Sequence, residues 1–281
     1  MLALFDESKI AVPVRAVSGD ECFRQLQTET MPDHYIEFQN VSKSFGDKQV
    51  IREVSFFVDS AETLAIMGRS GVGKSVTLQH IMGFLKPDTG RVIVAGEDIT
   101  NYTERELEQI RKKTTMVFQS GALFDSLSIF ENVAFPLREQ RDWTEDHIEE
   151  IVFGLLDLLE IRELAESLPS ELSTGMKRAT AIARALAAQP EAVLYDEPTT
   201  MVDPLMAQHI GDLIRKLKYQ LKLTSVVVTH DTRLARKVAD RVMFLEGGRA
   251  IFFGTAKELS ASTDPFIQEF LQQDELHPLA G

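Results

Sequence analysis

The fold of this chain is decided by the stretch Thr63-Leu64-Ala65-Ile66-Met67-Gly68-Arg69-Ser70-Gly71-Val72-Gly73-Lys74-Ser75. Its first residues form a short apolar run, as a buried parallel strand should, and its last residues open a helix that ends at Gly83. A glycine-rich turn between a strand and a helix points successive backbone N–H groups at one anion, and the positive end of the helix adds its attraction. The stretch therefore predicts a phosphate-binding loop within a parallel α/β sheet.

The loop fits the pattern Gly-x-x-x-x-Gly-Lys-Ser, which alone would fit kinases, GTPases, helicases and recombinases. The ammonium group of Lys74 should neutralise the β- and γ-phosphates, and the hydroxyl of Ser75 should bind Mg²⁺, a hard cation that prefers oxygen ligands. A tight turn that binds nothing is the alternative, and the flanking strand and helix argue against it. The predicted nucleotide-binding residues of the loop are Gly68, Arg69, Ser70, Gly71, Val72, Gly73, Lys74 and Ser75.

A later apolar strand, Val193-Leu194-Tyr195, delivers two adjacent carboxylates, Asp196 and Glu197. Ligands of open parallel sheets bind beyond the carboxyl ends of the strands. We expect Asp196 to hold Mg²⁺ and Glu197 to polarise the water that attacks the γ-phosphate. Because adjacent strand residues point to opposite sides, the two carboxylates are predicted to have different roles. Alone, such a pair would be solvated surface, but the phosphate loop favours catalysis.

A third segment, Ser173-Thr174-Gly175-Met176-Lys177-Arg178, opens a helix between the phosphate loop and the acidic strand. The N–H groups of a helix N-terminus, together with the Ser173 hydroxyl, suit a phosphate. An ordinary helix capped by serine is the alternative. In this order along the chain, the segment resembles the signature of the ATP-binding subunits of ABC transporters, usually written Leu-Ser-Gly-Gly-Gln.

The resemblance implies an α/β fold: a P-loop NTPase core of the ABC type with an antiparallel β subdomain and a helical lobe that carries the signature. It also implies an ATPase that works as a head-to-tail homodimer, in which Ser173, Thr174 and Gly175 of one subunit contact the ATP held by the other. Thr174 stands where the family has glycine. Its side chain would crowd the γ-phosphate, and turnover would then rise in a Thr174→Gly variant.

Further family positions fall in order along the chain, and the resemblance gives each a role. Gln119 would reach Mg²⁺ and link the core to the helical lobe, and His230 would contact the γ-phosphate and steady the attacking water. Asp203 would lie at the dimer interface. Phe45 would stack on adenine, although Phe56 and Phe57 are alternatives by composition.

Three regions are expected along the chain. Residues 1–33 show no sustained period and are predicted to form a loosely ordered extension, whereas residues 34–260 should form the ATPase domain. Residues from about 100 to 185 have mostly helical patterns and are predicted to form a lobe inserted into the core. Residues 261–281 should form a C-terminal helix and tail, to which we assign no chemistry.

Composition limits the possible partners. The chain has 281 residues, of which 44% are apolar, enough for a full core. Its formal net charge is −13, whereas nucleic acid favours a basic surface, so we expect no nucleic-acid role. The single cysteine, Cys22, can form no internal disulfide. There is no apolar run of about eighteen residues and no hydrophobic signal at the N-terminus, which predicts a cytoplasmic location.

The segments Val117-Phe118-Gln119-Ser120-Gly121-Ala122-Leu123-Phe124 and Met176-Lys177-Arg178 resemble the ATPases of Mla-type, Mce-associated phospholipid transporters. The resemblance implies a peripheral subunit on the cytoplasmic side of the inner membrane that drives phospholipid between membranes. It implies membrane permease subunits, an Mce-type lipid-binding protein and a small STAS-domain regulator as partners. The apolar patch 124–137 would accept a permease helix or belong to the core. A nucleotide-switched regulatory module without transport is the alternative function.

Overall fold

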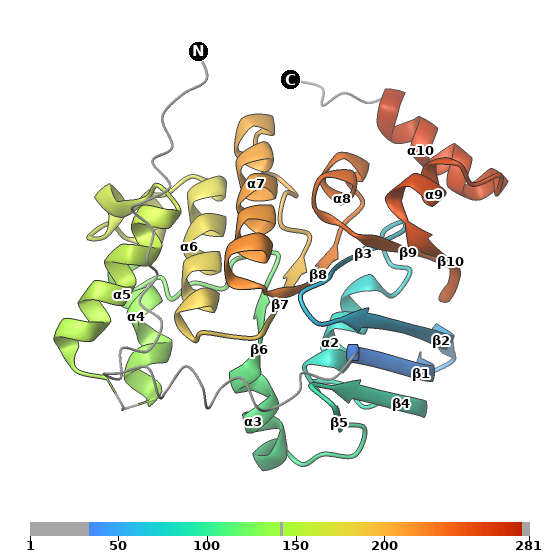
Figure 1. Ribbon diagram of the computed structural model, residues 1–281, viewed down its shortest axis with the longest axis horizontal. Helices are drawn as coiled ribbons and strands as arrows, with labels where there is room; N and C mark the ends of the chain where they lie inside the picture. Colours follow the sequence, from blue (N-terminus) through green and yellow to red (C-terminus); the bar gives the residue numbers. More distant parts are fainter. Residues whose placement is uncertain (1–33, 141–142, 277–281) are drawn as a thin grey trace. The chain divides into compact units, whose positions relative to one another are not determined.

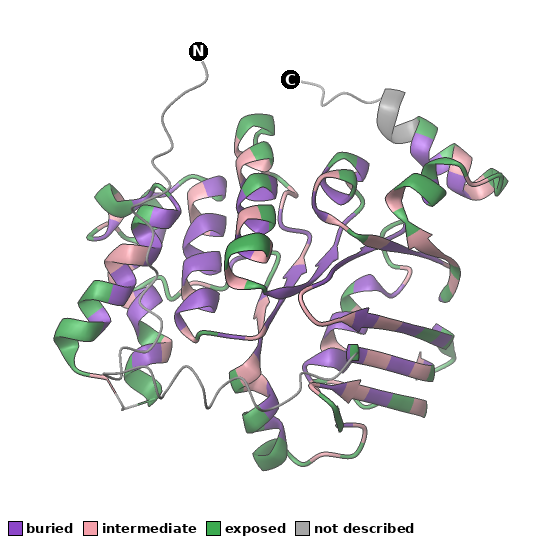
Figure 2. Ribbon diagram, viewed as in Figure 1, coloured by how far each residue is buried: buried purple, intermediate pink, exposed green. Residues whose placement is uncertain are grey.

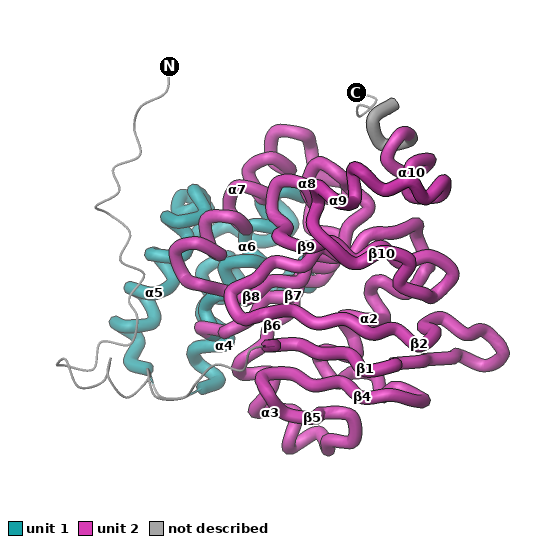
Figure 3. The backbone as a smooth tube through the Cα atoms, turned by 45° about the vertical axis from the view of Figure 1, so that its right-hand side comes forward, with its two compact units in different colours: residues 1–30, 121–188 teal, residues 31–120, 189–281 magenta. Residues whose placement is uncertain are grey.

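The computed structural model describes residues 34–140 and 143–276. The predicted extension at residues 1–33, with Cys22, and the tail beyond residue 276 lie outside the described residues. The described residues form two compact units (Figure 3). The smaller unit comprises residues 121–188, and the larger one combines the described residues before 121 with those after 188.

The larger unit contains a six-stranded sheet in the order β10-β9-β3-β8-β7-β6. Five of its strands are parallel, and β10 pairs antiparallel with β9 at one edge. β3 (Thr63–Met67) and β8 (Thr224–Val228) are buried along their whole length, as is typical of central strands covered on both faces. The other strands are β6 (Thr114–Val117), β7 (Ala192–Asp196), β9 (Arg241–Glu246) and β10 (Arg249–Thr255). The predicted parallel α/β core is confirmed.

Helices cover both faces of this sheet. Figure 1 shows α7 (Pro204–Leu221) and α8 (Thr232–Val238) on one face and α2 (Lys74–Ile81) on the other. The burial pattern agrees, because strands β3 and β8 are buried from end to end (Figure 2). Two C-terminal helices, α9 (Ala256–Ser260) and α10 (Pro265–Leu276), follow β10.

A second, antiparallel sheet of four strands has the order β2-β1-β4-β5. Its apolar side chains share one core with α2 and the six-stranded sheet, and Phe38 stacks on Phe56 with ring centroids 4.5 Å apart. Its strands are β1 (His34–Phe45), β2 (Lys48–Asp59), β4 (Thr89–Val94) and β5 (Glu97–Asp98). The helix α3 (Glu104–Lys113) begins at a capping box formed by Thr103 and Glu106. The antiparallel β subdomain that the resemblance implies is therefore present.

The smaller unit is helical and consists of α4 (Ile129–Gln140), α5 (Glu145–Leu158), two short 3-10 turns at Arg162–Leu164 and Pro169–Glu171, and α6 (Thr174–Ala187). The apolar side of α5 is buried, as its three-four spacing predicts. The unit starts later than the predicted boundary near residue 100, because β6 pairs with β7 and so belongs to the larger unit. Among residues 34–140 and 143–276, no helix is both long and apolar enough to cross a membrane.

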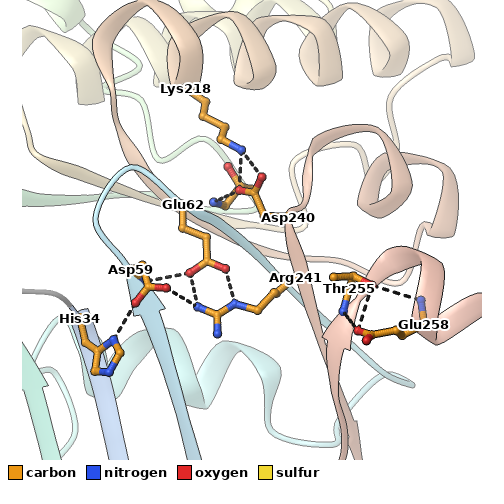
Figure 4. Close-up of polar contacts among 9 residues, drawn as sticks. His34, Asp59, Glu62, Lys218, Asp240, Arg241, Thr255 and Glu258 are labelled. Carbon is orange, nitrogen blue, oxygen red and sulfur yellow. Dashed lines mark hydrogen bonds and ion pairs between the residues drawn. The ribbon is translucent and has the colours of Figure 1, made fainter.

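One arginine connects the two sheets of the larger unit (Figure 4). The guanidinium of Arg241, the first residue of β9, donates to both carboxylate oxygens of Glu62 and to Asp59 Oδ2 at 3.0 Å. It also lies 4.2 Å from the ring centroid of Phe57 and 4.9 Å from that of Phe253. The hydrogen bonds to Glu62 raise the pKa of Arg241. Arg241 thus holds β2 and β9 together through both charge and aromatic contact.

The same network extends to both sides of Arg241 (Figure 4). The ring of His34 bonds Asp59 Oδ1 through Nδ1 at 2.6 Å, which fixes the start of β1 to the end of β2. On the other side, Asp240 accepts from the Thr63 backbone N–H at 2.8 Å and from the Lys218 ammonium. The start of β3, which leads into the phosphate loop, is therefore fixed to β9 and α7.

An Arg241→Ala variant should lower the free energy of unfolding by about 2 kcal/mol, because it leaves the carboxylates of Glu62 and Asp59 without their cation and removes two aromatic contacts. Urea denaturation measures this. The control is Arg249→Ala, whose ion pair with Glu53 is 58% and 68% exposed at its two ends. That variant should change the free energy of unfolding by less than about 0.5 kcal/mol. Equal losses in the two variants would contradict the role assigned to Arg241.

Candidate nucleotide site

A cavity of about 320 Å³ lies beside the phosphate loop, where β6, β7 and β8 end. Parallel strands bring their carboxyl ends to one edge of the sheet, so residues far apart in sequence meet here. The lining residues are Val50, Ser70, Gly71, Gly73, Lys74, Ser75, Val76, Gln119, Glu197, Thr200 and His230. The structure thereby brings together eight of the residues predicted from the sequence.

Three predicted loop residues, Gly68, Arg69 and Val72, do not line this cavity. Gly68 has a φ of 145°, and a Cβ atom there would lie 2.3 Å from the carbonyl oxygen of Leu245, so only glycine fits. Val72 lines a neighbouring hollow of about 600 Å³, which Ser70 and Gly71 also line. Both halves of the loop therefore contribute residues to the cavity.

Lys74 is 6% exposed, and its ammonium is held on three sides. It donates to the carbonyl oxygens of Gly68 at 2.9 Å and Arg69 at 3.2 Å, and lies 3.3 Å from Glu197 Oε1. A buried ammonium is stable only when its charge and donors are satisfied. The carbonyls and the carboxylate meet that need, and they place the ammonium where a phosphate would bind.

The carboxylate of Glu197 contacts His230 and Thr200 as well as Lys74. Its Oε2 lies 2.8 Å from His230 Nδ1 and accepts from the Thr200 hydroxyl at 3.2 Å. β7 ends at Asp196, and Glu197 has a φ of 48°, outside strand geometry. Asp196 Oδ1 accepts from the Ser75 hydroxyl at 2.9 Å. Both carboxylates thus face the N-terminal end of α2, and the prediction that they point to opposite sides was wrong.

The electrostatics of the cavity favour the ionised form of Glu197 and the protonated form of His230. Burial alone would raise the pKa of the Glu197 carboxyl, but the hydrogen bond and charge of His230, with the charge of Lys74, hold it below its ordinary value. The hydrogen bond to Glu197 raises the pKa of His230. The residue expected to act on water is therefore an ionised carboxylate at neutral pH, suited to accept a proton or orient water.

The donor set next to the cavity fits Mg²⁺. The Ser75 hydroxyl and the Asp196 carboxylate are hydrogen-bonded at the start of α2, and Gln119 lines the same cavity. All three offer oxygen, the ligand that Mg²⁺ prefers, and this ion usually takes one or two carboxylates and completes its shell with water and phosphate. Among residues 34–140 and 143–276, no cluster of three or more His, Cys, Asp or Glu side chains could hold a metal alone.

The predicted signature residues lie in the smaller unit, and they do not line the cavity. Ser173 caps α6, because its hydroxyl accepts from the Met176 N–H at 3.3 Å, and Thr174 and Gly175 form the first turn. Asp203 in the larger unit similarly caps α7 by accepting from the Met206 N–H at 3.0 Å. Their contacts with a second nucleotide or subunit stay predictions.

Of the three aromatic candidates for adenine stacking, Phe45 is the exposed one. Its side chain is 47% exposed, whereas Phe56 is 4% exposed and packed on Phe38. Phe57 lies against Arg241. Phe45 does not line the cavity, so adenine stacking stays a prediction.

Sequence reasoning missed Val50, Val76 and Thr200. Thr200 could have been found, because a hydroxyl three residues after Glu197 can bond its carboxylate within one turn. Val76 follows the phosphate-loop motif within the same helix. Val50 had no signal, because it comes from β2 of the other sheet.

Comparison with known proteins identifies the class of ATPase to which this geometry belongs. The model of the ABC transporter family matches residues 51–200. The class is therefore that of the ABC ATPases, which bind and hydrolyse ATP on a cassette of this kind. The chain belongs to the ABC transporter family, as an ATP-binding member.

The relatives cover most of the chain. It is 39% identical over 249 residues to the intermembrane phospholipid transport system ATP-binding protein MlaF of Haemophilus influenzae, spanning 89% of this chain and 94% of MlaF. It is 34% identical to the "Probable ribonucleotide transport ATP-binding protein mkl" of Mycobacterium leprae, over 87% of this chain and 70% of that protein. A solved dimer of the ATP-binding cassette MJ0796 bound to ADP and Pi is 31% identical with a TM-score of 0.73, covering 79% of this chain and 98% of that one.

The pair of Glu197 and His230 predicts a pH dependence of stability in the protein without nucleotide. Because the pKa of His230 is raised, its contribution is fully present below its unfolded value of 6.5 and is lost as pH rises through the folded value. Because the pKa of Glu197 is lowered, its contribution is present above its unfolded value of 4.5 and is lost as pH falls through the folded value.

The difference in unfolding free energy between wild type and His230→Ala should therefore be largest between pH 4.5 and 6.5. It should shrink by about 0.5 kcal/mol toward about pH 9, a small change because the His230 side chain is half exposed. Urea denaturation across this range measures it. A difference that is flat with pH, or that grows toward alkaline pH, would contradict the charged pair.

Proposed function

We propose that this chain is the ATP-hydrolysing subunit of a transporter that moves phospholipid between membranes. The observation that carries the proposal is its 39% identity to an MlaF protein across 94% of the length of that protein. Similarity over the whole cassette, rather than over the phosphate loop alone, supports a shared task. The name of the mkl relative points to ribonucleotide transport, but the identity there is 34% and covers 70% of that protein. No observation favours the regulatory alternative.

The residues in the cavity support a route for hydrolysis. The phosphate loop and Lys74 would bind the β- and γ-phosphates, and a phosphate that reaches Lys74 takes the place of the Glu197 carboxylate. Glu197 would then orient the attacking water and draw on its proton, and His230 would contact the γ-phosphate. Ser75, Asp196 and Gln119 would hold Mg²⁺, which when bound offsets negative charge on the phosphates.

Subunit pairing would turn this chemistry into motion. We infer a homodimer in which Ser173, Thr174 and Gly175 of one copy contact the ATP of the other, with Asp203 at the interface. The MJ0796 cassette, which is dimeric with ADP and Pi, supports this arrangement by analogy. Binding would close the dimer, and hydrolysis with product release would reopen it.

The smaller unit offers a surface for the permease. Phe124 and Phe135 are 42% and 38% exposed, and their ring centroids are 4.7 Å apart. Among the other apolar residues of α4, Val133 and Leu137 are buried, and Phe130 is half-buried against Phe153. The patch 124–137 thus includes core residues as well as an exposed aromatic pair, and we propose that this pair receives a helix of a membrane permease. The ATPase subunits would lie on the cytoplasmic side of the inner membrane, bound to the permease. An Mce-type lipid-binding protein in the periplasm and a small STAS-domain regulator would complete the assembly.

A Glu197→Gln variant should retain ATP binding and lose hydrolysis by at least about 100-fold, because the amide keeps the shape of the side chain but cannot accept a proton. Phosphate release measures hydrolysis, and a fluorescent ATP analogue measures binding. Glu149→Gln, at an exposed position of α5, serves as the control for loss of one carboxylate and should hydrolyse normally. Normal turnover in Glu197→Gln would remove this residue from its role.

The transport proposal is tested by isolating the tagged protein from its native membrane in mild detergent and identifying the recovered proteins and lipids by mass spectrometry. We expect permease subunits, an Mce-type protein and bound phospholipid. A permease recovered with ribonucleotide and no lipid would instead favour ribonucleotide transport, the function in the name of the mkl relative. A division-type membrane partner without lipid would leave the ATPase intact and reject phospholipid transport.

A further inference from the structure

Arg69, in the phosphate loop, directs its side chain to a helix at the far end of the chain. Its Nη2 lies 3.0 Å from Oε1 of Glu269 in α10, a residue 200 positions later. Its guanidinium carbon lies 4.6 Å from the ring centroid of Phe266, one turn earlier on the same helix. An arginine held by both a carboxylate and an aromatic ring has fewer conformations open to it than one held by either alone.

The helix α10 is itself anchored to the sheet. Ile267, Phe270 and Leu271 are 1%, 8% and 6% exposed, and they pack in one apolar cluster with β9. The ring of Phe270 meets that of Phe244 edge to face, with centroids 4.9 Å apart. Asp264 Oδ1 accepts the Phe266 N–H at 2.9 Å and fixes the start of the helix. Phe266 and Glu269, the partners of Arg69, therefore lie on a helix that is packed against the sheet.

The backbone of Arg69 acts on the catalytic lysine. Its carbonyl oxygen accepts from Lys74 Nζ at 3.2 Å, and the preceding carbonyl, that of Gly68, accepts at 2.9 Å. Gly68 is packed so closely on the carbonyl of Leu245 that the loop has little freedom at that end. Arg69 is the next residue, so the contacts of its side chain with α10 set where the second carbonyl lies.

We propose that Phe266 and Glu269 are positioning residues for ATP binding, which hold the phosphate loop in its binding conformation through Arg69. They act through another residue and touch no phosphate. The inference rests on the ATPase class alone and is independent of which substrate the transporter moves. By this proposal α10, for which the sequence predicted no chemical role, contributes to the affinity for ATP.

The test measures ATP hydrolysis by the full-length protein as a function of ATP concentration. Glu269→Gln should raise the KM and the Kd for ATP about two- to fivefold, because a half-exposed ion pair and an aromatic contact are each worth little alone. The kcat and the melting temperature should be unchanged, since a loop that binds ground state and transition state alike affects KM only. The shift in Kd should fade at about 0.5 M salt, as for a solvent-exposed charge pair.

Three comparisons separate positioning from a general loss of structure. Phe266→Tyr keeps a ring beside the guanidinium and should bind ATP as wild type does, whereas Phe266→Leu should weaken binding. Glu108→Gln, on the exposed side of α3, removes the same charge elsewhere and should leave the KM unchanged. In a double-mutant cycle, Glu269→Gln should add nothing to the weaker binding of Arg69→Gln.

An unchanged KM in Glu269→Gln would overturn the proposal, as would additive effects of the two substitutions in the cycle. A melting temperature that falls in parallel with the affinity would assign α10 a structural role only. None of these results bears on phospholipid, which the isolation experiment tests separately.

Discussion

The burial of one charge, the ammonium of Lys74, constrains the rest of the site. A cation that is 6% exposed needs partners on every side, and each of its partners fixes a different element. The hydrogen bonds from Lys74 to the carbonyls of Gly68 and Arg69 join the two ends of the phosphate loop. The ion pair with Glu197 joins the end of β7 to the start of α2. His230, at the end of β8, follows because it shares that carboxylate. The catalytic edge of the sheet is thus assembled around a lysine.

The elements that could be predicted from the sequence are those whose signals lie in neighbouring residues of the chain. The strand before Gly68, the helix after Gly73 and the strand before Asp196 each carry their signals within about ten residues, so their meeting at one edge follows from parallel pairing alone. The roles of Ser173 and Asp203 came from resemblance, and in the structure both cap helices. Helix capping takes place within one chain, whereas the contacts predicted for Ser173 and Asp203 require a second subunit.

What could not be predicted depends on contacts between distant residues or on one backbone angle. The turn of Glu197 out of strand geometry is a single dihedral angle at a residue that otherwise continues an apolar strand. The boundary of the helical unit shifted because β6 is short and its partner, β7, lies on the far side of the inserted helices in sequence. The contact of Arg69 with Glu269 joins residues 200 positions apart and leaves no pattern in either segment.

The ion pair between Glu197 and Lys74 has a further consequence for selectivity. Glu197 is a tethered competitor for the lysine, present at the high effective concentration of a group attached to the same framework. A monovalent anion such as chloride offers Lys74 one charge, which the carboxylate already supplies, and gains little by displacing it. A triphosphate brings several charges and also accepts the N–H groups of the loop. Competition from Glu197 therefore favours a multiply charged phosphate over chloride at Lys74.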